Sequence, residues 1–336
     1  MTWSLKNSAA VTALAMLCVS CSGATRSQIP RPSEDEMEFL VGQPMPSRFS
    51  KLDWRAGEPP QSNLVIYAVV PPRYEQSRLE ALAKAVGISG PIVPMPDDLT
   101  IAPGYWIKEP NPTNSFLWTS VYFSKSTGLI GHGSWDSGHR WDLKNRRPFA
   151  SGVPDRDEAF RRVIALLPAL GVTTNDLELR ANGTIRWQST TDGTTYTDRT
   201  DKQRKRYIRQ RTITLFQRVP NGGITHSIGN GGCLEAGFVS EGKLTSVEML
   251  FRQMKEVGQA KPLTKKEVIK ALEKGRGWTL RQFLPPNLTV TNCALVYPQG
   301  NSDLKQAYVW PFYGVTGFSI QQGQTNAVNI YVPLSW

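Results

Sequence analysis

The chain has 336 residues, of which 40% are hydrophobic and 20% charged, and its formal net charge is +11. These proportions are those of a globular protein with a buried core, and they exclude a chain that is disordered throughout. The basic balance favours acidic partners such as anionic lipid, acidic polymer or an acidic protein. A second explanation is that the charge serves solubility alone.

The first 20 residues have the pattern of a signal peptide. Lys6 precedes an apolar run over residues 9–19, which is shorter than the roughly 20 apolar residues that a membrane-spanning helix needs. Ser20 stands directly before Cys21, and this junction resembles the lipobox of bacterial lipoproteins, in which the cysteine is lipidated and becomes the new N-terminus. The resemblance implies export and a membrane anchor at Cys21, with the body facing the periplasm or the cell exterior. Ordinary secretion and a retained anchor are the alternatives.

Residues 22–62 are rich in Ser, Pro, Arg and Glu and show little periodicity. Together with Cys21 they predict a flexible tether over 21–62, which would hold the body away from the bilayer. Beyond it, recurring patterns of a helix with neighbouring strands predict three α+β units, at 63–150, 151–260 and 261–336.

Three amphipathic helices are predicted from apolar residues at helical spacing. Asp155 with Glu158, and Thr264 with Glu267, have the spacing of a capping box at a helix start. A glycine follows each helix, as is common at helix ends. The expected ranges are 73–86, 155–170 and 265–274.

The segments between the helices alternate between apolar and polar residues and predict strands. Turns at 182–183 and 241–242 predict two hairpins, over 177–187 and 234–251. The fold class is therefore α+β, with antiparallel sheets that are each covered on one face by a helix. The other strands are expected at 63–70, 118–124, from 129 onward, and at 207–219, 288–296, 306–318 and 328–332.

Several segments resemble exported bacterial proteins with PepSY-like and YycH/YycI-like modules, namely 64–72, 154–172, 236–248 and 262–272. In these families a strand pair with an acidic-Gly or Asn-Gly turn precedes a short helix. The resemblance covers 63–336 and implies repeated helix-on-sheet units. It also implies a non-catalytic role, because known members regulate other envelope proteins such as peptidases or sensor kinases.

The cysteines and histidines are few. Cys233 and Cys293 follow the leader, and in an oxidising compartment they either form a disulfide or remain free thiols. Cys233 and His226 are the residues that a nucleophilic pair would use. His132 and His139 match no zinc spacing. No catalytic residue, metal or cofactor is therefore expected.

A basic cluster is the clearest charged feature, and it could grip an anionic ligand. Residues 202–206 are expected in a solvated turn, and Arg209 and Arg211 on one exposed face of the strand that follows. The alternative is an edge strand that basic residues protect from aggregation. The cluster consists of Lys202, Arg204, Lys205, Arg206, Arg209 and Arg211.

These observations predict an envelope lipoprotein that binds or regulates another envelope protein or peptide, through a sheet edge that accepts an added strand. One alternative is a basic binder of anionic lipid or cell-wall polymer. A second is an envelope hydrolase that depends on Cys233 and the histidines. Nucleic acid is not an expected partner of an exported protein.

Overall fold

The computed structural model describes residues 29–334 except 47, 96–102, 111–117, 135–140, 143–146, 149–151, 198–202, 303–304 and 322. Glu34–Trp336 form one compact unit, which contains every helix and strand described below. The expected signal peptide over 1–20 and the lipidated Cys21 lie outside the described residues.

The three predicted helices are confirmed, and a fourth precedes them. Asp155 caps α3 by accepting the Glu158 N–H at 2.8 Å, while Thr264 and Glu267 form a complete capping box at α4. Gly87 and Gly171 adopt left-handed φ angles of 76° and 64° where α2 and η1 end. The helices are α1 Glu34–Val41, α2 Gln76–Val86, α3 Arg156–Leu166 and α4 Lys265–Glu273, with the 3-10 turns η1 Leu167–Leu170, η2 Thr174–Asp176 and η3 Ser240–Gly242.

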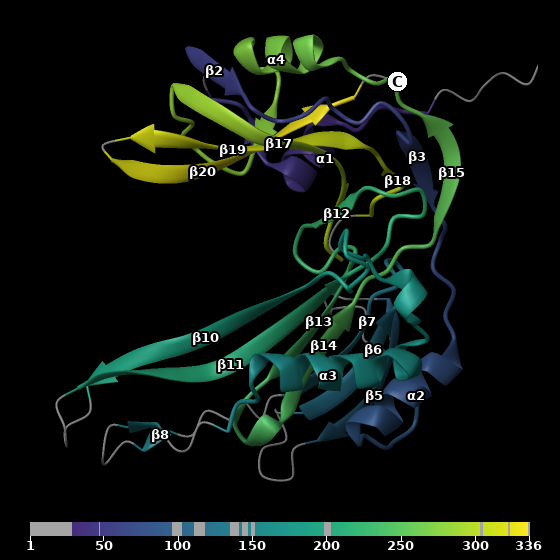
Figure 1. Ribbon diagram of the computed structural model, residues 1–336. Helices are drawn as coiled ribbons and strands as arrows, with labels where there is room; N and C mark the ends of the chain where they lie inside the picture. Colours follow the sequence, from purple (N-terminus) through teal and green to yellow (C-terminus); the bar gives the residue numbers. More distant parts are fainter. Residues whose placement is uncertain are drawn as a thin grey trace, which may run out of the picture. The chain divides into compact units, whose positions relative to one another are not determined.

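The largest sheet has eight strands, all antiparallel to their neighbours. Helices α2 and α3 cover one of its faces, in contact with β5, β6, β7 and β11 (Figure 1). In spatial order its strands are β10 Trp187–Thr197, β11 Arg204–Phe216, β13 Cys233–Phe238, β14 Leu244–Met249, β7 Ile130–Ser134, β6 Trp118–Ser124, β5 Gly104–Pro110 and β4 Val93–Pro94.

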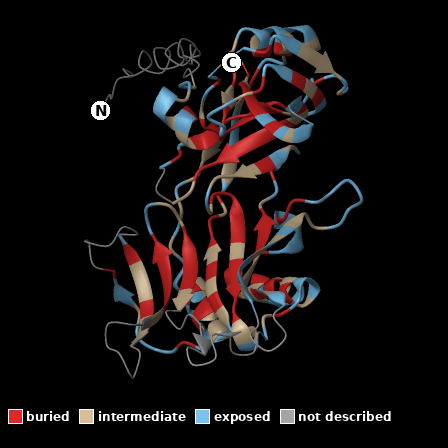
Figure 2. Ribbon diagram, turned by 90° about the vertical axis from the view of Figure 1, so that its left-hand side faces the viewer, coloured by how far each residue is buried: buried red, intermediate tan, exposed pale blue. Residues whose placement is uncertain are grey.

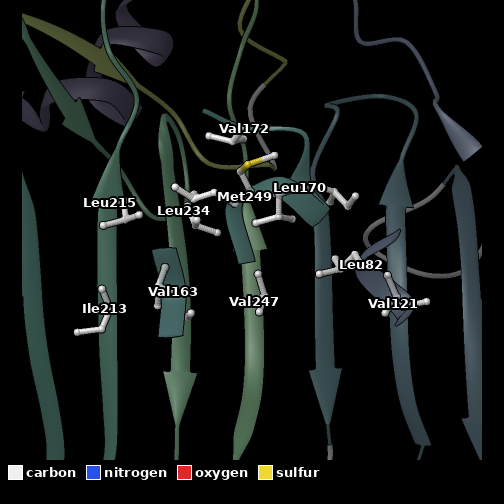
Figure 3. Close-up of a cluster of buried hydrophobic side chains, with 14 of the residues drawn as sticks. Leu82, Val121, Val163, Leu170, Val172, Ile213, Leu215, Leu234, Val247 and Met249 are labelled. Atoms are coloured by element: carbon white, nitrogen blue, oxygen red, sulfur yellow. The ribbon is translucent and has the colours of Figure 1, made fainter. Parts of the chain in front are cut away.

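The main core lies between this sheet and its two helices. Leu82 from α2 and Val163 from α3 are fully buried against strand residues such as Val121, Ile213 and Val247. Figure 3 shows these side chains gathered in one layer. In Figure 2 the strands are buried along much of their length, whereas the outer surfaces of the helices are exposed. Burial of the alternate apolar residues therefore explains why the alternating segments form this sheet.

A second sheet has seven strands and contacts α1 and α4. Its long strand β17 pairs in parallel with two short strands, β2 along its first half and β12 along its second. Its strands are β1 Gln43–Pro44, β16 Trp278–Thr279, β20 Gln324–Pro333, β19 Phe312–Gln321, β17 Asn287–Gln299, β12 Ile224–Ser227 and β2 Lys51–Trp54. The described residues also form two small sheets. One has three strands, β15 Met254–Gln259, β3 Val65–Val69 and β18 Tyr308–Val309, and the other has two, β8 Trp141–Asp142 and β9 Arg147–Pro148.

The start of the folded part differs from the expected tether over 21–62. Met37, Leu40 and Val41 on α1 are buried, and β1 and β2 both pair with strands of the seven-stranded sheet. The apolar residues of this stretch are too few to show a periodic pattern, but they complete a core formed by the C-terminal strands.

The expected boundaries at 150 and 260 also differ from the sheets. The eight-stranded sheet combines strands from 93–134 with strands from 187–249, so it joins the first two expected units. Strand β12 belongs instead with the C-terminal strands. The expected hairpin over 177–187 is formed but short: Leu179 and Ile185 make one antiparallel bridge, and the N–H groups of Arg180 and Arg186 donate to the carbonyls of Thr184 and Glu178. Alternation along the chain identifies strands, but it does not determine which strands pair.

The capping box of α4 provides a test of local stability. We expect Thr264→Ala to lower the free energy of unfolding by about 1 kcal/mol, because the Glu267 N–H loses its acceptor. Lys266→Ala, an exposed change within the same helix, should alter it by less than about 0.5 kcal/mol. Urea unfolding of both variants measures the difference, and equal effects would contradict the assigned cap.

Candidate functional site

A partly buried ion pair between Glu178 and Arg186 contacts the edge of the seven-stranded sheet. Arg186 Nη1 donates to both carboxylate oxygens of Glu178, at 2.9 and 2.8 Å. The same nitrogen donates to the Thr225 carbonyl at 3.1 Å, and the Thr225 N–H donates to Glu178 Oε2 at 3.0 Å. Burial raises the pKa of Glu178, and the charge of Arg186 opposes that rise. The ion pair thus satisfies both backbone polar groups of one residue in β12, as a neighbouring strand would.

His226 lies beside this ion pair and is held neutral. Its Nδ1 is 3.3 Å from the Tyr331 hydroxyl, and its Nε2 is buried without a hydrogen-bond partner among the described residues. Burial, together with the nearby charge of Arg186, lowers the pKa of His226 to about 4. An imidazole with this pKa is poorly matched to proton transfer near neutral pH.

Two glutamates face each other across the hairpin formed by β13 and β14. Glu235 is directly opposite Glu248 in the register. The Tyr122 hydroxyl and the Asn230 amide donate to Glu248, at 2.9 and 3.0 Å, while the Thr214 hydroxyl donates to Glu235 at 3.2 Å. Burial raises the pKa of Glu235, and the charge of Glu248 adds to the rise. These donors offset the repulsion between the two carboxylates, which lie directly opposite each other across the hairpin.

The sequence contained a signal for this glutamate pair and, through the predicted hairpin over 177–187, for the pairing of Glu178 with Arg186, but none for the contact of that ion pair with β12. A hairpin centred on the predicted turn at Glu241 and Gly242 places Glu235 opposite Glu248 by counting alone. Glu178 and Arg186, by contrast, meet Thr225 from another sheet, and no local pattern encodes that contact.

Across the described part of the chain, no group of three or more His, Cys, Asp or Glu side chains is placed to hold a metal ion.

Both cysteines outside the leader are free thiols, so the disulfide considered from the sequence is not formed. Cys233 lies in β13 and Cys293 in β17, which belong to different sheets. Burial raises the pKa of each thiol to about 12. The partner of Cys233 is the Ser227 hydroxyl, at 3.3 Å, rather than His226. The thiolate that a nucleophilic pair requires is therefore disfavoured.

His132 is a buried residue of β7 and faces the helix-covered core, opposite Val121 and Val247. Its Nδ1 lies 3.1 Å from the Ser120 carbonyl, and burial lowers its pKa. His139 lies outside the described residues.

The predicted basic cluster lies on a long hairpin formed by β10 and β11. Strand β11 pairs with β13 only over Arg211–Phe216, so its first seven residues extend past that neighbour with β10 as their partner (Figure 1). Because β11 begins at Arg204, most of the expected solvated turn over 202–206 is strand. We call residues 193–197 and 204–210 the arm.

Two arginines of the cluster are engaged by groups of the fold. Arg209 is paired with Asp192 at 2.7 Å. Arg211 is half-buried and donates to the Pro154 carbonyl and the Ser189 hydroxyl, at 2.9 and 3.0 Å. The exposed face expected for these two arginines is therefore not present, whereas Arg204 is exposed on the arm. Lys202 and the side chains of Lys205 and Arg206 are outside the description.

Among the described residues, no helix is both long and apolar enough to cross a membrane.

No family model and no curated protein matches the chain. Among solved structures, an uncharacterized protein from Eubacterium rectale ATCC 33656 is similar to it, with 12% sequence identity and a TM-score of 0.36. That match covers 84% of this chain and 86% of the other.

The pKa of His226 makes stability depend on pH in a known direction. His226 stays neutral in the folded chain down to about pH 4, whereas the unfolded chain takes up the proton near 6.5, so stability is lost as the pH falls through this window. We expect His226→Gln to reduce the loss between pH 7 and about 4.5 by roughly 2 kcal/mol. Tyr331→Phe, which keeps the histidine, should retain the full loss. Urea unfolding across this range checks the slope, and identical slopes for His226→Gln and the parent would refute the assignment.

Removing the charge of Glu178 should be costly. Glu178→Gln leaves the partly buried Arg186 guanidinium without a counterion, and we expect it to lower the free energy of unfolding by about 3 kcal/mol. The exposed pair of Asp53 and Arg55 provides the comparison, and Asp53→Asn should cost less than about 1 kcal/mol. Chemical denaturation measures both, and the prediction fails if the two costs are equal.

Proposed function

We propose that this chain is an exported lipoprotein, anchored through Cys21, that binds another envelope protein without catalysis. The partner would supply an extended, acidic segment that adds to strand β10 as a further strand. The observation that carries this proposal is the position of β10, which is the end strand of the eight-stranded sheet and pairs with β11 alone among the described strands.

The composition of β10 suits such a role. An exposed edge is a template for another strand, and proteins often block it with proline or lysine. Strand β10 has the sequence WQSTTDGTTYT, which contains neither, and its five threonines favour the extended conformation. The register between the two strands shifts between Asp192 and Gly193, where Arg209 of β11 has no opposite residue in β10. The extra residue therefore lies in β11, and β10 itself contains no inserted residue that would interrupt pairing with an added strand.

The neighbouring strand supports an acidic partner. Strand β11 carries Arg204, Lys205 and Arg206 opposite the last residues of β10. Backbone hydrogen bonds would supply affinity, and these basic residues would select for charge. The resemblance to PepSY-like and YycH/YycI-like proteins, whose helix-on-sheet units occur in exported regulators, belongs to the same proposal.

Site-specific photocrosslinking in intact cells tests this function. With the photoreactive residue at Thr195 on β10, we expect a discrete protein adduct whose crosslinked peptide is acidic. The same residue at Lys266 on α4 should give no such adduct, and Arg204→Glu should weaken the Thr195 adduct several-fold while Arg276→Glu leaves it unchanged. Equal adducts from Thr195 and Lys266, or no protein adduct from Thr195, would reject strand addition at β10.

The basic arm favours one alternative, a binder of anionic lipid or cell-wall polymer. Such binding should weaken steeply with salt, and it should be lost when Arg204, Lys205 and Arg206 are all changed to Gln. Recovery of polymer or lipid, but no protein, from the Thr195 crosslink would favour this reading. Burial keeps the Cys233 thiol protonated, so we do not propose a hydrolase that uses it.

A further inference from the structure

A cavity of about 560 Å³ lies apart from β10 and is lined by three arginines, Arg78, Arg218 and Arg252. We propose that this cavity binds a small ligand through an oxyanion, either a phosphate or a carboxylate. The arginines come from three separate places, namely α2 and the segments that follow β11 and β14. None of them belongs to the basic cluster that the sequence singled out.

Arg78 is held at the cavity by neutral groups. Its Nε and Nη2 donate to the Leu170 carbonyl, at 3.1 and 2.6 Å, and a Cβ on Gly171 would lie only 3.0 Å from Nε. The nearest carboxylate oxygen belongs to the exposed Glu75, at 3.9 Å. The guanidinium is therefore fixed in place, while most of its charge is left for another partner.

Arg252 is the most deeply buried of the three, with 5% of its surface exposed. Its Nη2 donates to the carbonyls of Gly300 and Asn301, at 2.8 and 3.3 Å, whereas its Nη1 is buried without a partner in the described structure. Carbonyl dipoles do not neutralise a full charge, and a buried charge without a counterion is unfavourable. An anion bound in the adjacent cavity would lower that cost.

Arg218 is exposed, and its side chain forms no ion pair with any carboxylate that the structure describes. Its backbone N–H donates to the Asp176 carbonyl at 2.7 Å, which fixes where the side chain begins. The carboxylate of Asp176 also lines the cavity, but it accepts the N–H and the hydroxyl of Thr173, both at 2.8 Å. Three arginines thus line the cavity together with one acidic residue, whose carboxylate is already engaged.

The size and lining of the cavity indicate the class of ligand. A volume of about 560 Å³ lies in the usual range for small-molecule sites. Guanidinium groups bind phosphate and carboxylate through paired hydrogen bonds, and they suit these groups better than lysine does. The remaining wall includes the amides Asn175 and Gln253 and the apolar Val172 and Phe251. The ligand therefore combines an anionic group with a body that has both polar and apolar surface.

Thermal unfolding of the full chain tests this site with defined probes. Pyrophosphate and citrate are each added at low millimolar concentration, with sodium chloride holding the ionic strength constant. We expect at least one probe to raise Tm by about 2–4 °C relative to chloride alone. A rise with pyrophosphate alone identifies a phosphate site, a rise with citrate alone a carboxylate site, and a rise with both a general oxyanion site.

The variants separate this cavity from the rest of the basic surface. Arg218→Gln should abolish the rise without changing Tm in chloride, because the side chain is exposed and makes no ion pair with a described residue. Arg276→Gln, an exposed arginine outside the cavity, should keep the full rise. No rise with either probe, or an unchanged rise in Arg218→Gln, would overturn the proposal. Neither result bears on strand addition at β10, which uses different residues.

Discussion

The contact of the Glu178–Arg186 ion pair with Thr225 is the constraint on which the joining of the two large sheets depends. Strand β12 has β17 on one side only, so its other edge must find hydrogen-bond partners elsewhere. The ion pair offers an acceptor to the Thr225 N–H and a donor to its carbonyl. Arg186 directly precedes β10, and Glu178 lies opposite Arg186 in the short hairpin that leads into this strand, so the geometry of the eight-stranded sheet determines where β12 can lie.

Other polar contacts between the sheets have the same character. Arg252, which follows β14, donates to two carbonyls just beyond β17, and Gly231 lies so close to Gly300 that a side chain there would collide with its backbone. The strongly shifted pKa values of His226 and Cys233 arise from burial at these contacts. A shifted pKa often marks a catalytic site, but structural networks produce it as well. Here the shifts follow from packing the two sheets together.

Whether an arginine is available to a ligand depends on the acceptors within its reach. Arg209 and Arg211 appear in the sequence as part of one basic cluster, yet Asp192, Pro154 and Ser189 engage them inside the fold. Arg218 and Arg252 show no clustering in the sequence, but the structure leaves them without a carboxylate partner among the described residues. The availability of an arginine for binding therefore follows from its tertiary contacts and not from clustering along the chain.

The sequence by itself determined three of the helices and several of the strands, because their signals are local. Capping residues, terminal glycines and apolar periodicity act over a few residues, and they located α2, α3, α4 and the hairpin of β13 and β14. Only the tertiary structure decided that α1 belongs to the folded unit, that strands on either side of α3 share one sheet, and that Glu178 and Arg186 meet Thr225. It also brought together Arg78, Arg218 and Arg252, which are far apart in the chain. Such pairings depend on the total surface buried and on every polar group finding a partner, and no short stretch of sequence contains that information.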